Sequence, residues 1–357
     1  MIEKLGDIAS YVNGFAFKPS EWAEEGLPII RIQDLTGTSS NPNYYNKPYD
    51  KKYEINKGDV LISWSASLGV YIWCGEKALL NQHIFKVIFD KKDINKDFFV
   101  YQVSHILKKA SEQAHGATMR HLTRPVFNSL PFWLPERNIQ NKIADTLNLL
   151  SKLIVAKEKQ VKELDKLIKS RFVEMFGDPS ANTKRWKIQR LDEFSENLDF
   201  RRKPITASER VKGKYPYYGA SGIVDYVEDY IFDDNILLIS EDGANLLMRS
   251  SPVAFSVHGK VWVNNHAHVY KFTNICIQKY IEIYFSMIDI SDQITGSAQP
   301  KLNQAKLNAM KFAIPDKIYL DRYYKFVCHI DKSKLAVQKS LEELETLKNS
   351  LMQQYFD

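Results

Sequence analysis

The residues best suited to chemistry in this sequence are polar side chains gathered on short segments that contain glycine. Thr118, Arg120, His121 and Arg124 lie within seven residues on a segment led by Gly116. An arginine guanidinium can hold guanine through two hydrogen bonds, or it can neutralise a phosphate. This segment is therefore a candidate for contact with a nucleic acid.

Amide side chains form a second group of candidates, and they occur twice. Asn81-Gln82-His83 precedes a segment in which apolar and polar residues alternate, and Asn264-Asn265-His266 lies at the corresponding place later in the chain. Asparagine and glutamine can pair with the N6 and N7 edge of adenine. The clusters Arg201-Arg202-Lys203 and Lys184-Arg185-Trp186-Lys187 are basic and suited to phosphate.

The candidate contacts come from both halves of the chain. The residues that we expect to contact a nucleic acid are Trp64, Asn81, Gln82, His83, Thr118, Arg120, His121, Arg124, Arg201, Arg202, Lys203, Asp242, Asn245, Asn265, His266, Gln299 and Lys301. For any one of them, a solvated turn or a strand cap is an equally good explanation. As a set that recurs at matched places, they favour a binding function, and we predict no catalytic, cofactor or metal residues.

Three patterns suggest other chemistry, and we interpret each as structural. Asn41-Pro42-Asn43-Tyr44 resembles the Asn-Pro-Pro-Tyr motif of amino-methyltransferases but lacks the second proline, so we expect a turn. His266-Ala267-His268 could present two imidazoles, but no cysteine or carboxylate lies close in sequence to complete a metal site. Ser63 and His83 suggest a nucleophile and its base, yet Ser63 lies in no nucleophile elbow.

Two heptad repeats must position these segments. The first has its inward positions at Ile143, Leu147, Leu150, Ile154, Lys157, Val161, Leu164, Ile168, Arg171 and Met175. The second, 180 residues later (Pro135 to Pro315), has them at Tyr323, Val327, Ile330, Lys334, Val337, Leu341, Leu344, Lys348, Leu351 and Tyr355. This spacing is typical of a long coiled-coil helix. The chain is therefore two copies of one unit.

The repeat gives an expected fold class of α+β with a pseudo-twofold internal repeat. We expect mixed α/β globular domains at residues 1–134 and 178–314, with coiled-coil helices at 135–177 and 315–357. Prolines precede both helices, and Gly177-Asp178-Pro179 ends the first. The seam cations Lys157, Arg171, Lys334 and Lys348 should fix the register at some cost in stability.

The helices should pair antiparallel. About 40 helical residues make a rod of roughly 60 Å. If the helices were parallel, the globule between them in the sequence would have to carry the chain back along that length, although its radius of gyration should be only about 14 Å. The alternative is that each seam packs on its own globule as an ordinary amphipathic helix. Antiparallel pairing predicts that residue 143 lies near residue 355 and not near residue 323.

Composition sets further limits. The 357 residues include 49 basic and 43 acidic side chains, for a net charge of +6, which permits a polyanionic partner without requiring one. Cys74, Cys276 and Cys328 stand far apart, so neither a disulfide framework nor a zinc cluster is implied. With no signal sequence or long apolar run, we expect a soluble, cytoplasmic protein.

The order of globule, heptad helix, globule, heptad helix resembles the specificity subunit of Type I restriction-modification systems. The sequence segments that resemble this family are Gly58 to Ser63, Tyr215 to Gly222, Glu241-Asp242-Gly243, and Gly116 to Pro125 followed by Leu134-Pro135-Glu136. The resemblance implies a DNA-binding subunit without catalysis of its own, which docks two methyltransferase subunits that restriction subunits can join. S-adenosylmethionine would belong to the methyltransferase, and ATP and magnesium to the restriction partner.

An antiparallel rod supports the same interpretation on physical grounds. It relates the two globules by a pseudo-twofold axis, which is the symmetry of DNA half-sites, and one DNA turn of about 34–36 Å fits within its length. Because the globules differ in sequence, we expect an asymmetric bipartite target.

Two alternatives remain open. The chain could itself be a methyltransferase or a nuclease, although no strand followed by a glycine-rich cofactor loop occurs in either copy. It could instead be a coiled-coil scaffold whose globules bind protein or carbohydrate. Binding of S-adenosylmethionine by the isolated chain would favour the first, and salt-sensitive binding to duplex DNA would exclude the second.

Overall fold

The computed structural model describes residues 1–357 except 39–40, 66, 114–121 and 297–298. It divides into two compact units: unit 1 holds residues 1–157 and 340–357, and unit 2 holds residues 158–339. Two long helices, α5 (Arg137–Phe176) and α10 (Lys317–Phe356), each contribute one part to both units. Among the described residues, no helix is both long and apolar enough to cross a membrane.

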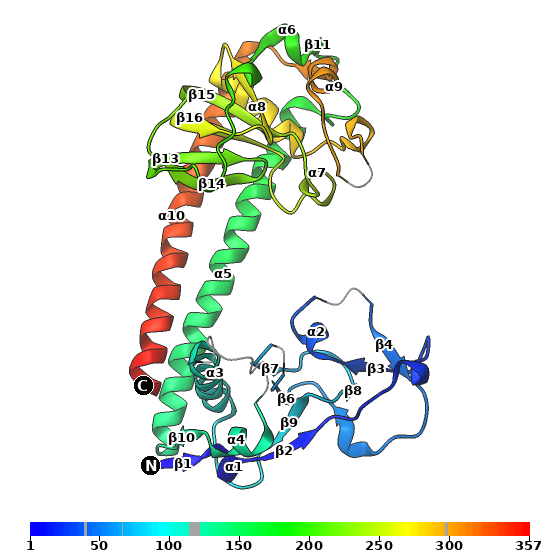
Figure 1. Ribbon diagram of the computed structural model, residues 1–357, viewed down its shortest axis with the longest axis vertical. Coiled ribbons are helices and arrows are strands. Elements are labelled where there is room, and N and C mark those ends of the chain that lie inside the picture. The colour runs from blue at the N-terminus through cyan, green and yellow to red at the C-terminus, as the bar shows by residue number, and fades with distance from the viewer. Residues whose placement is uncertain (39–40, 66, 114–121, 297–298) are drawn as a thin grey trace. The chain divides into compact units, whose positions relative to one another are not determined.

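Unit 1 is a mixed α/β globule built on short strands (Figure 1). Its strands are β1 (Ile2–Lys4), β2 (Ser10–Asn13), β3 (Leu27–Ile30), β4 (Asn43–Tyr45), β5 (Glu54–Ile55), β6 (Val60–Ser63), β7 (Gly69–Ile72), β8 (Ala78–Leu80), β9 (Ile84–Ile88) and β10 (Pro131–Trp133). Besides its parts of the long helices, it contains α3 (Lys96–Gln113) and the short helices α1 (Leu5–Ile8), α2 (Ile32–Leu35) and α4 (Arg124–Ser129). The strands form sheets in the orders β2-β9-β6-β7 and β4-β3-β8-β5, with β1 paired to β10.

Unit 2 gathers longer strands into one sheet. Its strands are β11 (Lys187–Arg190), β12 (Ser195–Asn197), β13 (Lys212–Gly219), β14 (Gly222–Val227), β15 (Phe232–Ser240), β16 (Ala254–Val263), β17 (Ala267–Phe272) and β18 (Lys311–Ile314). Its short helices are α6 (Leu191–Phe194), α7 (Asn245–Met248), α8 (Ile275–Phe285) and α9 (Gln304–Ala309). The sheet order is β12-β17-β15-β16-β13-β14, and β11 pairs with β18.

The two units share one topology. β15 in unit 2 takes the place of β5 and β6 in unit 1, and β16 takes the place of β7 and β8, so the order β2, β9, β5/β6, β7/β8, β3, β4 repeats along the sheet. Each unit also contains a single parallel pairing among its described strand pairs, β3 with β8 and β13 with β16. The predicted internal repeat and mixed α/β class are therefore confirmed.

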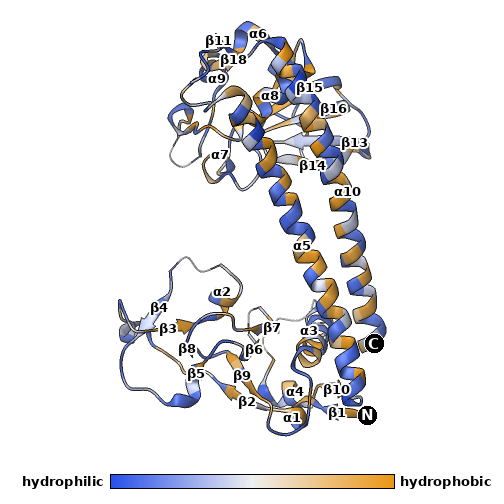
Figure 2. Cartoon of the chain, turned by 180° about the vertical axis from the view of Figure 1, so that it is seen from behind, coloured by the Kyte–Doolittle hydropathy of each residue, from blue (hydrophilic) through white to orange (hydrophobic). Residues whose placement is uncertain are grey.

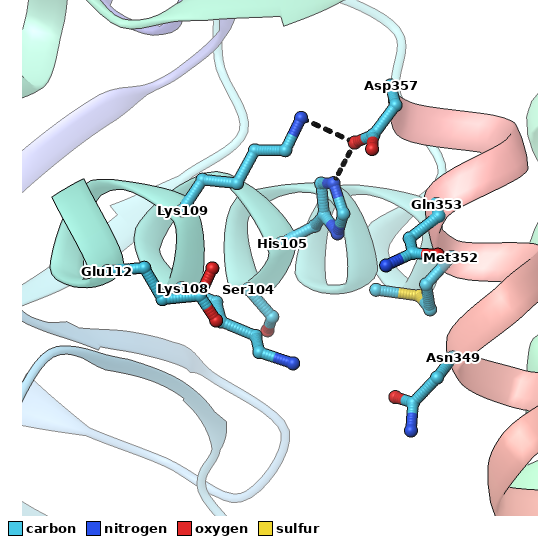
Figure 3. A pocket seen from close by; sticks show the side chains of 9 residues that line it. All are labelled: Ser104, His105, Lys108, Lys109, Glu112, Asn349, Met352, Gln353 and Asp357. Carbon is cyan, nitrogen blue, oxygen red and sulfur yellow. Dashed lines mark hydrogen bonds and ion pairs between the residues drawn. The ribbon is translucent and has the colours of Figure 1, made fainter.

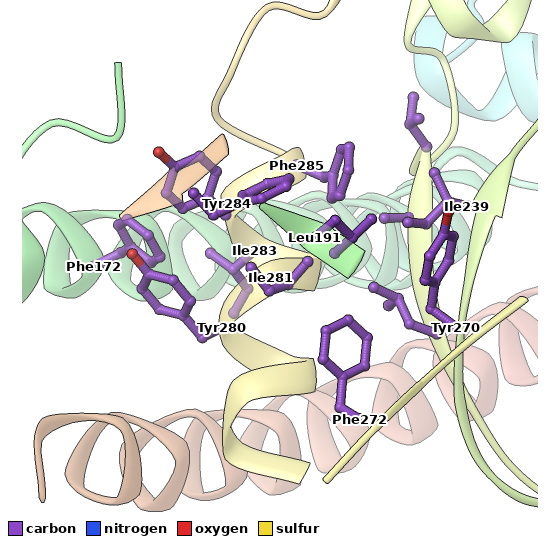
Figure 4. Close-up of a cluster of buried hydrophobic side chains, with 14 of the residues drawn as sticks. Phe172, Leu191, Ile239, Tyr270, Phe272, Tyr280, Ile281, Ile283, Tyr284 and Phe285 are labelled. Atoms are coloured by element: carbon purple, nitrogen blue, oxygen red, sulfur yellow. The ribbon is translucent and has the colours of Figure 1, made fainter. Parts of the chain in front are cut away.

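Apolar side chains from the sheets and from the long helices form one core in each unit. In unit 2, Phe172 of α5 stacks on Tyr280 of α8, with ring centroids 5.0 Å apart, and Tyr284 packs nearby (Figure 4). In unit 1, Phe98 of α3 packs edge-on against Phe356 of α10 at 5.6 Å. Burying such aromatic side chains is what fixes each globule to the helices.

The long helices pair antiparallel, as predicted. In unit 1, Ile143 and Leu147 share a core with Leu351 and Tyr355. In unit 2, Ile168 and Phe172 share a core with Tyr323, Val327 and Ile330. All predicted seam residues are buried or half-buried.

Besides the seam, the globules cover a second face of the helix ends. Phe172 and Phe176 lie outside the predicted seam yet are almost fully buried, since α8 packs over them. The heptad pattern identifies the face that meets the other helix, but it does not identify this second face.

Three of the four seam cations, Arg171, Lys334 and Lys348, have charged or aromatic partners. Lys334 of α10 forms an ion pair with Asp165 of α5 at 2.6 Å. Arg171 pairs with Glu174 on its own helix at 2.7 Å, and the Lys348 ammonium lies 5.8 Å from the centre of the Tyr101 ring. The Lys334–Asp165 pair joins the two helices and supports the expected role in register.

Candidate nucleic-acid interface

In unit 1, three segments meet at the end of the central strand β6. The backbone N–H of Trp64, directly after β6, donates to the carbonyl of His83 at 3.2 Å. The N–H of Leu122 in turn donates to the carbonyl of Trp64 at 3.0 Å. These bonds bring the turn before β9 and the segment that follows residues 114–121 to the same edge of the unit.

Unit 2 repeats this arrangement with other side chains. The N–H of Glu241, directly after β15, donates to the carbonyl of His266 at 2.9 Å, and the N–H of Leu302 donates to the carbonyl of Glu241 at 2.8 Å. Trp64 and Glu241 therefore occupy the same place, as do His83 and His266. We call this pair of hydrogen bonds and the residues they join the recognition frame.

The frame of unit 1 is aromatic. The indole of Trp64 donates through Nε1 to Asn13 Oδ1 at 3.3 Å and stacks on Phe85, with centroids 5.7 Å apart. His83 meets Trp64 edge-on at 4.9 Å. The backbone of His83 has φ +73°, the left-handed region that non-glycine residues rarely adopt, so the ring is held in place at a cost in strain.

Arg124 lies beside this aromatic group. Its Nη2 donates to the carbonyl of Tyr11 at 2.7 Å, and its guanidinium lies 5.9 Å from the centre of the Phe85 ring. The remaining donors of the guanidinium stay available for an anionic or carbonyl acceptor.

The frame of unit 2 is charged. Arg202 donates to Glu241 at 2.5 Å, and Lys301 lies 3.1 Å from the other carboxylate oxygen of Glu241. His266 contacts Asp242 through Nδ1 at 2.9 Å. This leaves Nε2 of the exposed His266 ring for an outside partner.

The buried side chain of His268 packs beside the charged frame. His268 contacts Asp199 through Nδ1 at 2.6 Å and the carbonyl of Leu302 through Nε2 at 2.8 Å, so both of its ring nitrogens face acceptors. Burial by itself would raise the pKa values of Asp199 and Glu241. The hydrogen bonds from His268 and Arg202 and the positive charges nearby outweigh this effect, and both pKa values are lowered.

Asp199, Glu241 and His268 place their ligand atoms within 4.8 Å of one another. No carboxylate lies close to His268 in sequence, but the fold brings two beside it, because β12, β15 and β17 are neighbours in the sheet. Arg202 and Lys301 already supply positive charge to this group. We therefore interpret it as an ion-pair network and assign no metal to it.

The amide candidates divide into caps and free side chains. Asn81 Oδ1 accepts from the N–H of Gln82, and Asn264 Oδ1 accepts from the N–H of His266, both at 2.8 Å. These two asparagines stabilise their turns. Gln82 and Asn265 are exposed on those turns and remain candidates for contact.

Several other candidates take no part in the hydrogen bonds of the recognition frame. Arg201 lies over Phe232, at the opposite end of β15 from Glu241, with its guanidinium 4.6 Å from the ring. Asn245 Oδ1 accepts from the N–H of Ser251 and closes a loop after β15. The indole of Trp186, in the second basic cluster, donates to the carbonyl of Phe176 at the end of α5. Lys203 and Gln299 are exposed.

Some predictions fall outside the described residues or need correction. Thr118, Arg120 and His121 lie outside the described residues. Asn43 and Tyr44 begin strand β4 and do not form a turn, because they pair with β3. Ser63 is buried, and its hydroxyl donates to the carbonyl of Ser67.

Sequence reasoning also missed Asn13, Asp199 and Glu241 as members of the site. Glu241 follows Ile239-Ser240 as Trp64 follows Ile62-Ser63, so aligning these strand ends would have found it. Asn13 and Asp199 gave no such signal.

Comparison with known proteins decides the family. The family model described as Type I restriction modification DNA specificity domain matches residues 1–165 and again residues 183–345. The chain belongs to this family. Membership favours a specificity subunit over the scaffold alternative.

Two curated relatives are type I specificity subunits. A putative specificity subunit of Haemophilus influenzae is 37% identical over 130 residues, which cover 36% of this chain and 33% of the relative. The EcoBI specificity subunit of Escherichia coli is 29% identical over 168 residues, 46% of this chain and 35% of the relative. The matched segments thus span about a third of the length of these relatives.

Solved structures show the same fold. A Type I restriction-modification S subunit from M. genitalium aligns with 100% of this chain and 96% of its own, with a TM-score of 0.58 and 16% identity. A chain from a structure of type I complex assembly aligns with 100% of this chain and 97% of its own, with a TM-score of 0.59 and 12% identity. At these identities the likeness establishes the fold alone.

Proposed function

We propose that this chain is the DNA-recognition subunit of a Type I restriction-modification complex. Residues 1–134 and 178–314 would each read one half of an asymmetric, bipartite duplex target. The observation that carries the proposal is the recognition frame, in which identical backbone hydrogen bonds present Trp64 in one unit and Glu241 in the other. A duplicated scaffold with different exposed chemistry is suited to two different half-sites.

The chemistry of the two frames predicts different base preferences. In unit 1, Gln82 and Arg124 offer the amide and guanidinium groups that pair with adenine and guanine, beside an aromatic surface suited to a thymine methyl group. In unit 2, the carboxylate of Asp242 and the imidazole of His266 offer acceptors and a polar ring, and a carboxylate can accept from cytosine N4. Lys301, which is half exposed, is suited to phosphate.

Arg202 has a positioning role in this proposal. Its guanidinium donates to Glu241 and to the carbonyl of Ala267, and its side chain is only 14% exposed. Arg202 would hold Glu241 and the turn of His266 in place and leave phosphate contact to more exposed cations.

The helix pair would dock the partner subunits. Leu149, Leu153, Val155 and Leu167 of α5 are exposed apolar residues, and apolar segments recur along both helices (Figure 2). Exposed apolar surface of this kind is typical of a protein interface. We propose that two methyltransferase subunits cover it, that restriction subunits can join them, and that methylation and cleavage take place on these partners. S-adenosylmethionine, ATP and magnesium would be bound by the partners.

The test starts from the methylated sequence in the source genome, which defines the target. The chain assembled with its methyltransferase should protect two separate segments of that duplex with unprotected base pairs between them. A single continuous palindromic footprint would contradict the proposal. Calorimetry of the isolated chain with S-adenosylmethionine should give no binding, and saturable binding would support the enzyme alternative.

A further inference from the structure

Unit 2 contains a hollow of about 410 Å³ beside the helix pair, and none of its lining residues belongs to the recognition frame. Asp165 and Lys169 of α5 form one wall, and Val327 and Lys334 of α10 form the next. The end of α8 and the loop after α7, with Arg249, complete it. All lining residues belong to unit 2.

The acidic residues of this hollow are already neutralised. Asp165 pairs with Lys334 at 2.6 Å, and Lys279 lies 2.9 Å from Glu282 and 3.7 Å from Asp331. Burial would lower the pKa of Lys279, but these two carboxylates outweigh it and the pKa is raised, as expected for a lysine in ion pairs.

Two cations in the hollow form no close ion pair among the described residues, although Arg249 attracts the carboxylate of Asp289 at longer range. Lys169 Nζ donates to the carbonyl of Ser286 at 3.3 Å, and Arg249 Nη1 donates to the carbonyl of Phe285 at 2.8 Å. Arg249 Nη2 is buried and has no partner within the described part of the chain. The backbone of Arg249 has φ +51°, the left-handed conformation that ends α7, and this turn directs the chain into the loop that lines the hollow. A buried donor without an acceptor is costly unless a ligand supplies one.

Unit 1 contains a related hollow of about 200 Å³, in which the chain supplies its own carboxylate (Figure 3). It lies between α3 and the last turns of α10, and α3 follows β9 as α8 follows β17. There, Asp357 lies 2.5 Å from both His105 and Lys109. Asn349 lines this hollow and corresponds in the repeat to Lys169, which lines the hollow of unit 2. Asp357 directly follows α10, and the residue that directly follows α5 is Gly177. Unit 2 therefore lacks a carboxylate equivalent to Asp357, and neither Lys169 nor Arg249 forms a close ion pair among the described residues.

We infer that the hollow of unit 2 binds an acidic side chain of a methyltransferase subunit, which Arg249 and Lys169 hold through charge-assisted hydrogen bonds. The inference rests on the proposed function, because it names a contact for the partner that the helices dock. The lining carries four cations, Lys169, Arg249, Lys279 and Lys334, against the three carboxylates of Asp165, Glu282 and Asp331. A single protein carboxylate would balance this excess of one positive charge, whereas a chain of phosphates would exceed it.

The experiment uses the full chain and the methyltransferase subunit of the same system, with affinity measured by calorimetry. Lys169→Glu and Arg249→Asn should each weaken binding by about tenfold or more, as expected when one partner of a desolvated charge pair is lost. Asparagine tolerates the left-handed backbone at position 249. Lys162→Glu places the same charge change seven residues earlier on the same face of α5, outside the hollow, and should have little effect.

Rescue identifies the source of the carboxylate. An Asp→Lys or Glu→Lys substitution in the methyltransferase should restore binding to the Lys169→Glu chain. Equal loss in Lys169→Glu and Lys162→Glu, or no loss in the hollow variants, would overturn the inference while the proposed function stands. Weaker binding of the chain alone to DNA, with methyltransferase affinity unchanged, would assign the hollow to phosphate and overturn it as well. If the wild-type chain does not bind the methyltransferase, the proposed function itself fails.

Discussion

The hydroxyl of Tyr323 donates a hydrogen bond to the backbone carbonyl of Ile168 at 3.0 Å, and this bond joins α10 to α5 inside the core of unit 2. Both residues are buried seam positions of the two helices. A polar bond at this place specifies the register of the pair, which apolar packing alone would fix less firmly.

Replacing Tyr323 by phenylalanine should lower the free energy of unfolding by about 1 kcal/mol, the usual net value of one hydrogen bond. Urea denaturation followed by circular dichroism measures it. Tyr319→Phe is the matched control, because Tyr319 is exposed and its hydroxyl has no hydrogen bond among the described residues. An equal effect of both substitutions would show that the bond contributes nothing.

The ion-pair network of unit 2 should make the stability of the protein fall at low pH. The pKa values of Asp199 and Glu241 are lowered in the folded state. Their contribution is therefore complete above the ordinary carboxyl values of about 4 and is lost as the pH falls through the lower folded values. Thermal unfolding between pH 7 and pH 3 should show this loss. Asp199→Asn should flatten the acid side of the profile, whereas Glu345→Gln, on the exposed face of α10, should not.

The two amides of the unit 1 turn should behave differently when each is replaced by alanine. Gln82→Ala should leave stability unchanged and, if Gln82 reads a base, relax specificity at one half-site by about 1–3 kcal/mol. Asn81→Ala should lower stability instead, because its Oδ1 caps the N–H of Gln82. Binding to duplexes that vary in one half-site at a time, together with thermal melts, separates the two effects. Loss of specificity at both half-sites in Gln82→Ala would contradict the division of labour between the units.

Lys301 should contribute to the salt dependence of DNA binding. If Lys301 contacts phosphate, Lys301→Ala should make the negative slope of log affinity against log salt concentration less steep by about one. The loss of affinity should be similar for all DNA sequences. Lys325→Ala, an exposed lysine on α10, is the control. An unchanged slope in Lys301→Ala would remove Lys301 from the phosphate contacts and leave its ion pair with Glu241 as its role.

The sequence by itself determined the duplicated plan and the helix pair. Burial along a helix follows a local period, so the spacing of residues such as Ile143, Leu147, Val327 and Ile330 was enough to identify the seam. The loop amides were also identifiable by type, although the sequence did not separate the capping Asn81 from the exposed Gln82.

Only the tertiary structure decided the composition of the recognition frames and of the hollow in unit 2. Asn13 meets Trp64, Asp199 meets His268, and Arg249 meets the end of α8, in each case across a wide gap in sequence. Such contacts depend on strand order and on how helices pack on a sheet, which no local pattern of residue types encodes. The same reason explains why Phe176 is buried outside the heptad seam, because its partner Tyr280 lies on a helix that the seam does not describe.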